Sequence, residues 1–338
     1  MSAPAGKQGI VAVGYGGSEA AQLAVRWAAN YAAAAGLDLR VVHAWVWPVF
    51  TKNLGPVKGV AGSGLRHSAE AILAEGVELA RDAVLEAAGA TRPDQTASAG
   101  GAGQAPDAIP EQTPSDAAPF DAALASPPGV ERAVPAMEPQ YAGPAVEGFM
   151  EAGLPAPVLR DAARGATLLV LGSRNLGILL DQVAGSVCLD LAGSAPCPVM
   201  VIRRPRNPGH PVVVGVDASP RSPSTLAQAV RLAEILGAPL QLVHVTSQRG
   251  GARDERGRHG MLHGQELLDH AVEEARGLAP GLEISGFLRE GHGAARELLA
   301  AAADSDVLVL GSHSPMAGSG STVSGVLHKA GCNVLVTR

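Results

Sequence analysis

Cysteine, positive charge and long apolar runs are all scarce in this sequence. The 338 residues include three cysteines, Cys188, Cys197 and Cys332. Their odd number and their spacing fit neither a disulfide framework nor a zinc site, so we expect buried thiols in a reducing cytoplasm. The formal net charge is −6, so no global basic field would attract nucleic acid or an anionic membrane.

Two further features are missing from the chain. No apolar run approaches the ~18 residues that a membrane-spanning helix needs. The first residues, MSAPAGKQG, contain no apolar core of the kind that an export signal has. The overall composition is typical of packed globular domains, because apolar residues make up 46% of the chain and charged residues 17%. A chain of this length usually forms about two domains.

The strongest local pattern lies in Leu168–Arg203. The apolar run Leu168–Leu171 predicts a buried strand, and Val199–Ile202 predicts another. Between them, a glycine-bearing loop leads into a helix that we expect to include Gly185 and Ser186. Glycine lets backbone amides approach a phosphate without a Cβ in the way, and a helix N-terminus adds unpaired donors and the positive end of a dipole. The stretch therefore predicts an anion-binding loop.

An alternation of strands and helices occurs twice along the chain. The first copy begins with the strand Ile10–Gly14 and a helix that Ser18 is predicted to cap. The second begins with the strand Pro211–Asp217 and a helix that Ser219 is predicted to cap. Five strands in each copy predict an α/β fold of two tandem, doubly wound, five-stranded parallel sheets.

The linker Arg203–His210 separates the two copies, which gives expected domains of residues 1–204 and 205–338. The first domain carries an additional segment of about residues 91–140 that is dense in Ala, Pro, Gly, Ser and Thr. Such a composition cannot bury enough surface to offset its ordering entropy, so we expect this insertion to be disordered. A second flexible loop is expected over Asn53–Gly64.

The pattern around the anion-binding loop resembles that of a known family. The order Gly172-x-x-Asn175, then Gly185-Ser186, then Ala195–Val199 (APCPV) is similar to the G-x2-G-x9-G-[ST] nucleotide loop and last strand of the universal stress protein family. The resemblance implies an adenine nucleotide alpha-hydrolase-like fold with strand order 3-2-1-4-5. In such a sheet the ligand crevice lies where the strand order reverses, between strands one and four.

The resemblance also implies a ligand, an adenine nucleotide such as ATP, with or without Mg²⁺. In the family an acidic residue after strand one contacts the nucleoside, and the residue after the strand-two histidine meets the adenine. The first copy has Gly16 where the acid would be. Its implied ligand-binding residues are Gly14, Ala44, Gly172, Ser173, Asn175, Gly185 and Ser186.

The second copy departs from the pattern in the opposite way. It has the acidic residue, but its glycine loop is shorter than the first. Its implied ligand-binding residues are Asp217, Val245, Gly311, Ser312, Gly320 and Ser321. Neither copy has the complete set. The first copy is better suited to binding the phosphates, and the second is better suited to recognising the nucleoside.

The sequence favours a binding module over an enzyme. His43 and His244 lie in apolar strands without an accompanying carboxylate or nucleophile, so they read as core histidines. His259, His263 and His270 have nearly helical spacing, but no cluster of Cys or carboxylate residues completes a metal site, so a solvated helix face is favoured. The resulting prediction is a nucleotide-binding stress-response or regulatory module. Slow ATP hydrolysis stays open.

Two other functions are alternatives to this prediction. The first is an interaction or dimerisation protein with degenerate pockets, which Gly16 and the shortened second loop favour. The second is an enzyme of the wider nucleotide-binding superfamily with adenylation or flavin chemistry, for which the sequence shows no further motifs.

The two last strands predict how the copies meet. Val199–Ile202 and Val334–Thr337 are short and apolar, and as exposed sheet edges they would promote aggregation. In the family resembled, last strands pair antiparallel between subunits. We therefore expect the two copies of this chain to pair in the same way, as a pseudo-dimer. Two such chains could associate again as a homodimer.

Overall fold

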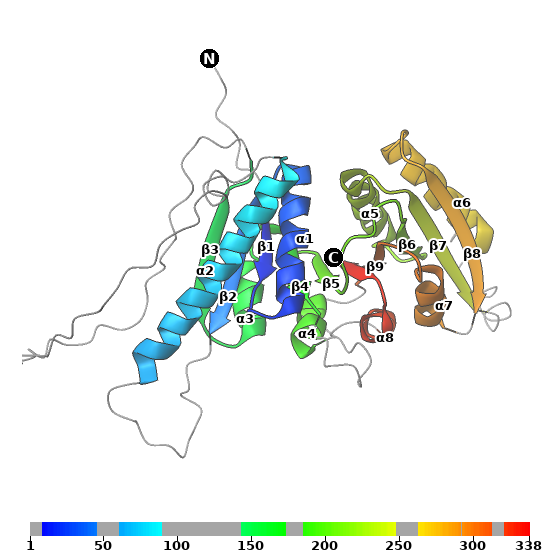
Figure 1. Cartoon of the computed structure of the whole chain (residues 1–338). Coiled ribbons are helices and arrows are strands. Elements are labelled where there is room, and N and C mark those ends of the chain that lie inside the picture. The colour runs from blue at the N-terminus through cyan, green and yellow to red at the C-terminus, as the bar shows by residue number, and fades with distance from the viewer. Residues whose placement is uncertain are drawn as a thin grey trace, which may run out of the picture.

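The computed structural model in Figure 1 contains one continuous sheet with helices on both faces. It describes residues 9–45, 61–89, 143–173, 185–247, 263–291, 293–312 and 321–338. The first copy contains β1 (Ile10–Gly14), α1 (Glu19–Ala35), β2 (Asp38–Trp45), α2 (Ala61–Ala87), β3 (Val146–Ala152), α3 (Pro155–Ala162), β4 (Ala166–Gly172), α4 (Ser186–Ser194) and β5 (Val199–Ile202).

The second copy repeats this order of elements. It contains β6 (Val212–Val216), α5 (Ser222–Leu236), β7 (Leu240–Ser247), α6 (Gly264–Leu278), β8 (Ile284–Gly291), α7 (Ala294–Ala301), β9 (Val307–Gly311), α8 (Ser321–Lys329) and β10 (Asn333–Thr337). Each copy therefore has the predicted strand–helix alternation.

The strand order confirms the predicted topology. The ten strands run β3-β2-β1-β4-β5-β10-β9-β6-β7-β8. Each copy therefore has the order 3-2-1-4-5, and the second copy is read in the reverse direction across the sheet. Within each copy the neighbouring strands are parallel. The copies join through β5 and β10, which pair antiparallel with Met200 opposite Leu335. The predicted pairing of the two last strands is confirmed, and the C-terminus lies between the two halves in Figure 1.

Alternation along the strands divides the core between the two sheet faces. Val11 and Val13 belong to a core that α1, α2, α5 and α6 cover, whereas Ala12 belongs to the opposite core under α3, α4, α7 and α8. Successive strand residues point to opposite faces, and both faces are covered by helices, which explains why the strands are apolar throughout. Both cores continue across the β5–β10 junction.

Arginines that follow the two last strands link each copy to a helix of the other. Arg203 follows β5, and its guanidinium donates to the carbonyl oxygen of Leu327 near the end of α8. Arg338 follows β10, and its guanidinium donates to the carbonyl oxygens of Leu191 and Ala192 in α4, at 3.4 and 3.3 Å. The last carbonyls of a helix have no partner within it, and cations near a helix C-terminus are stabilising.

The predicted start of the first helix is confirmed. Ser18 is the N-cap of α1, and its Oγ accepts a hydrogen bond from the Ala21 amide at 3.3 Å. Gly36 ends the helix with φ 64°, a left-handed conformation that glycine adopts without strain.

The predicted cap of the equivalent helix in the second copy is wrong. Arg221, not Ser219, is the N-cap of α5, and the helix begins at Ser222. The Ser219 amide donates to Oδ1 of Asp217 at 3.0 Å, and the Ser222 amide donates to the Ser219 carbonyl at 3.0 Å. These bonds form a tight turn with Pro220 at its second position, so this proline opens a turn instead of a helix.

Two other boundaries differ from the prediction, and one prediction is untested. Gly185 precedes α4 as its N-cap instead of lying inside the helix. α2 begins at Ala61, so the predicted end of the flexible loop Asn53–Gly64 is wrong, because its last four residues are helical. The Arg66–Glu70 ion pair, 3.1 Å long, supports the early turns of α2. The insertion at residues 91–140 lies outside the described residues.

None of the helices in the described ranges is both long and apolar enough to cross a membrane.

The close approach of α1 to β4 requires glycine at position 172. A Cβ on Gly172 would lie 2.2 Å from the Ala20 carbonyl oxygen and 2.9 Å from the Ala21 amide nitrogen. Both atoms belong to backbone, so they cannot move aside as a flexible side chain could. The glycine of the predicted phosphate loop thus also has a packing role in the fold.

This packing role predicts that Gly172→Ala destabilises the protein. We expect a loss of about 1–3 kcal/mol in the free energy of unfolding, because overpacking a rigid contact costs this much. Urea denaturation followed by circular dichroism measures the effect. Gly16→Ala is the matched control, since a Cβ there meets no atom within 4 Å. Equal stabilities of the two variants would contradict the packing argument.

Candidate functional site

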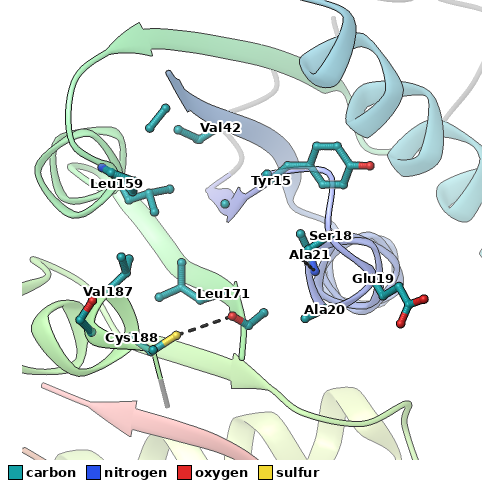
Figure 2. A pocket seen from close by; sticks show the side chains of 17 residues that line it. Tyr15, Ser18, Glu19, Ala20, Ala21, Val42, Leu159, Leu171, Val187 and Cys188 are labelled. Atoms are coloured by element: carbon teal, nitrogen blue, oxygen red, sulfur yellow. Dashed lines mark hydrogen bonds between the residues drawn. The ribbon is translucent and has the colours of Figure 1, made fainter. Parts of the chain in front are cut away.

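A cavity of about 540 Å³ lies at the carboxyl ends of β1 and β4. This is the position where the strand order reverses, as the topology predicts. Five residues proposed from the sequence line this cavity together, although they come from four separate segments: Gly14, Ala44, Gly172, Gly185 and Ser186. Figure 2 shows the cavity from close by.

Apolar side chains form one wall of the cavity. Val42, Leu159 and Leu171 contribute to it and are each less than a tenth exposed. In Figure 2, Leu159 and Leu171 lie across from the first turn of α1. A Cβ on Gly14 would lie 3.0 Å from Leu159, so the glycine at the end of β1 lets α3 approach the strand. The result is a concave, mainly apolar surface of the kind that binds flat organic groups.

The N-terminal ends of three helices also border the cavity. Ser18 and Ala21 of the α1 start, Pro155 at the first position of α3, and Ser186 at the first position of α4 all line it. No side chain caps α3 or α4. Three helix N-termini therefore direct positive dipole ends toward one space, which favours an anionic ligand. Pro155 and Pro157 have no amide hydrogen, so the amide donors come mainly from the first turns of α1 and α4.

Tyr15 lines the cavity and was missed by the sequence analysis. Its hydroxyl donates to Oε1 of Glu75 in α2 at 2.7 Å, so its ring points toward α2 and away from the apolar wall (Figure 2). Burial, together with this bond to Glu75, raises the pKa of Tyr15 to about 12. The phenol is therefore neutral at physiological pH and acts as a hydrogen-bond donor. The only signal in the sequence was its place directly after strand one.

Ser18, Glu19 and Cys188 are further cavity-lining residues that the sequence analysis did not propose as ligand-binding groups. The Glu19 carboxylate points away from the apolar wall in Figure 2. Cys188 is buried, and its Sγ lies 3.7 Å from the Gly172 carbonyl oxygen, a weak hydrogen bond that links α4 to the end of β4.

The histidine of strand two has the same contact in both copies. Nδ1 of His43 lies 2.8 Å from the Tyr15 carbonyl oxygen, and Nδ1 of His244 lies 2.8 Å from the Val216 carbonyl oxygen. Because a carbonyl oxygen can only accept, each imidazole donates from this nitrogen. The two histidines fix the chain where β1 and β6 end, which agrees with the structural role predicted for them.

Other residues proposed from the sequence occupy different environments. Ser173 and Ser312 are buried, and their amides donate to the Ile202 and Thr337 carbonyl oxygens at 2.8 and 3.1 Å, which continues the pairing of β4 with β5 and of β9 with β10. Ser173 is not among the residues that line the 540 Å³ cavity. Asn175 and Gly320 lie outside the described residues, and Ser321 is an exposed residue at the start of α8.

The equivalent cavity of the second copy is much smaller, about 100 Å³. Asp217, Val245 and Gly311 line it, so it contains three of the residues proposed for this copy. Val245 is bulkier than Ala44 of the first copy, and it reduces the free space. The carboxylate of Asp217 accepts the Ser219 amide, so this acid also has a local structural role.

A cation lies at the start of the second glycine loop. The guanidinium of Arg221 donates to the Ser312 carbonyl oxygen at 3.1 Å. The second copy thus combines an acid, a nearby arginine and little free volume, whereas the first combines a large cavity with three helix N-termini.

Comparison with known proteins gives a family match. The chain matches the Universal stress protein family over residues 9–203 and 209–338. It is 27% identical over 252 residues to Universal stress protein Rv2005c of Mycobacterium tuberculosis, an alignment that covers 73% of this chain and 67% of that protein.

A solved structure that aligns over nearly the whole chain shows the same fold. A universal stress protein from Archaeoglobus fulgidus superposes with a TM-score of 0.63 at 15% identity, and the match covers 97% of this chain and 98% of that one. A shorter universal stress protein from the same organism, solved in complex with dAMP, is 26% identical and covers 39% of this chain and 100% of its own, with a TM-score of 0.32. The family match spans both copies and nearly the whole chain, and we conclude that the chain belongs to the universal stress protein family.

Proposed function

We propose that the first copy binds an adenine nucleotide, ATP, in the 540 Å³ cavity, and that the protein acts in the cytoplasm as a stress-response or regulatory module instead of a catalyst. The observation that carries this proposal is the convergence of three helix N-termini on a cavity with an apolar wall. Such a site offers amide donors to phosphates and a dry surface to a base.

The residues present fit this ligand. Gly172 and Gly185 line the cavity beside the first turns of α1 and α4, and the missing Cβ of Gly172 lets α1 approach this edge closely. Val42, Ala44 and Leu159 would contact the flat base on the other side. Mg²⁺, if it accompanies the nucleotide, would be held mainly by the phosphates, and comparing binding with and without it tests that part of the proposal.

The second candidate function is an interaction protein whose pockets no longer bind nucleotide. Two observations favour it. Gly16 supplies no carboxylate to a nucleoside, and the cavity of the second copy is only about 100 Å³. In this alternative the fold would serve the pairing of the two copies and the docking of a partner.

ATP is expected to raise the melting temperature of the full-length protein. A ligand at 100 times its Kd stabilises the native state by about 2.7 kcal/mol, which corresponds to several degrees. Gly185→Val is expected to abolish the shift, because Gly185 lines the cavity and has φ −59° and ψ 152°, angles that valine adopts readily. Differential scanning fluorimetry with ATP, ADP and AMP, each with Mg²⁺ or EDTA, measures the shift.

Gly281→Val is the control for this experiment, since a Cβ there meets no atom within 4 Å and the residue lies in the turn before β8. This variant should keep the full response. A parent protein that no nucleotide stabilises would support the interaction-protein alternative. A response that survives in Gly185→Val would instead locate binding in the second copy. Phosphate release at the rate of an ordinary enzyme would contradict the non-catalytic role.

Gly16→Asp is expected to tighten nucleotide binding by about tenfold. A Cβ at Gly16 meets no atom within 4 Å, and the residue lines the cavity, so an aspartate there could accept hydrogen bonds from the ribose hydroxyls. Hydrogen bonds to a charged group contribute about 1.5–3 kcal/mol. Isothermal titration calorimetry should show the gain with ATP and not with 2′,3′-dideoxy-ATP. An equal gain for both ligands would mean that the carboxylate does not contact the ribose.

A further inference from the structure

The two copies differ in the space beside their first two helices. In the first copy, the ring of Tyr15 fills this space. That ring lies against Gly76 of α2, where an added Cβ would be 2.5 Å from Cδ1 of the ring. Its hydroxyl reaches Glu75 at the same level of the helix. The space between the start of α1 and the middle of α2 is thus occupied by a phenol.

The contacts of the two sheets identify the equivalent residues of α6. Leu73 and Val77 of α2 lie over Gly148 of β3, at 3.3 and 3.0 Å from the position of a Cβ on that glycine. Leu268 and Val272 of α6 lie over Gly286 of β8 in the same way, at 3.2 and 2.8 Å. The two glycines are equivalent, because each lies on strand three of its copy, opposite Val41 of β2 in the first and Leu242 of β7 in the second.

This alignment matches Glu75 and Gly76 of the first copy with His270 and Ala271 of the second. The equivalent of Tyr15 is Val216, because each of these residues accepts a hydrogen bond from the strand-two histidine through its carbonyl oxygen. Val216 is buried in the same core face as Tyr15. It is too short to extend across to α6.

A cavity of about 210 Å³ occupies this space in the second copy, between the start of α5 and α6. Leu226, Leu267 and Ala271 form its base, and all three are less than a tenth exposed. His270 lines it at the position where Glu75 receives the Tyr15 hydroxyl in the first copy. The second copy therefore has room for a ring, with a polar group at the position where a hydroxyl would end.

The charges around this cavity are of one sign. Asp217 and Glu274 contribute carboxylates to its lining, and Ser219 and Ser222 contribute hydroxyls. No lysine or arginine is among its described lining residues. A ligand with a positive charge would be attracted to this rim, and an anionic one would be repelled.

We propose that the cavity between α5 and α6 binds a small phenolic amine, whose ring takes the place that the Tyr15 side chain fills in the first copy and whose ammonium group faces Asp217 and Glu274. The ring would lie on Leu226, Leu267 and Ala271, and its hydroxyl would bond to His270. This site is separate from the 540 Å³ cavity, so the proposal does not depend on whether that cavity binds nucleotide.

The test uses the full-length protein with tyramine as the probe, measured by isothermal titration calorimetry and by the melting temperature. Tyramine should bind and raise the melting temperature. The second probe, 4-hydroxyphenylacetate, has the same ring and the opposite charge, and it should bind at least tenfold more weakly. Equal binding of the two probes, or no binding of tyramine, would overturn the proposal.

Two variants fill the cavity from different elements. Val216→Tyr places in β6 the side chain found in the first copy, and Ala271→Leu adds volume from α6. Each should weaken tyramine binding at least tenfold, and Val216→Tyr should itself raise the melting temperature if its ring takes the vacant place. If one variant fails to fold, the other carries the test.

Tyramine affinity unchanged in a folded filling variant would contradict the assigned location. Gly185→Val separates tyramine binding in the second copy from nucleotide binding in the first. Tyramine should bind this variant as tightly as it binds the parent protein. Loss of tyramine binding in Gly185→Val would place the probe in the first copy and would overturn the proposal.

Discussion

The antiparallel pairing of β5 with β10 is the contact on which the rest of the structure depends. Val199, Met200 and Val201 face Val336, Leu335 and Val334, and all are buried. Without this pairing each copy would end in an exposed apolar edge, which favours aggregation. The guanidinium groups beyond the two strands bind helix carbonyls of the opposite copy, so the junction is held by side chains as well as by backbone. One sheet with two continuous cores results.

That shared framework explains how the two copies could diverge without losing the fold. The first copy keeps a large cavity beneath three helix N-termini but has Gly16 in place of an acid. The second keeps Asp217, but Val245 and its other lining residues leave little room at the equivalent place. It has instead a cavity between α5 and α6, where the first copy has the ring of Tyr15. Each difference lies at the rim of a sheet whose strands remain in register.

Patterns of apolar residues were sufficient to predict the sheet. The strands Ile10–Gly14 and Val199–Ile202 have the predicted bounds, because buried parallel strands appear as short uninterrupted apolar runs. The prediction that Ser219 caps α5 was wrong because a local hydrogen bond to Asp217 makes a turn at this position. Tyr15 was missed because its role depends on α2, which lies 60 residues further along the chain and whose position no local pattern reveals. The sizes of the cavities were equally unpredictable, since they depend on how helices from distant segments pack.

Hydrogen exchange at β5 and β10 tests the central claim most directly. If the two strands pair within the chain, the amides of Val199–Ile202 and Asn333–Thr337 should exchange as slowly as those of the central strands β1 and β6. The edge strands β3 and β8, which have a neighbour on one side only, provide the comparison in the same protein. Exchange of β5 and β10 at the rate of β3 and β8 would contradict a single sheet joined at this junction.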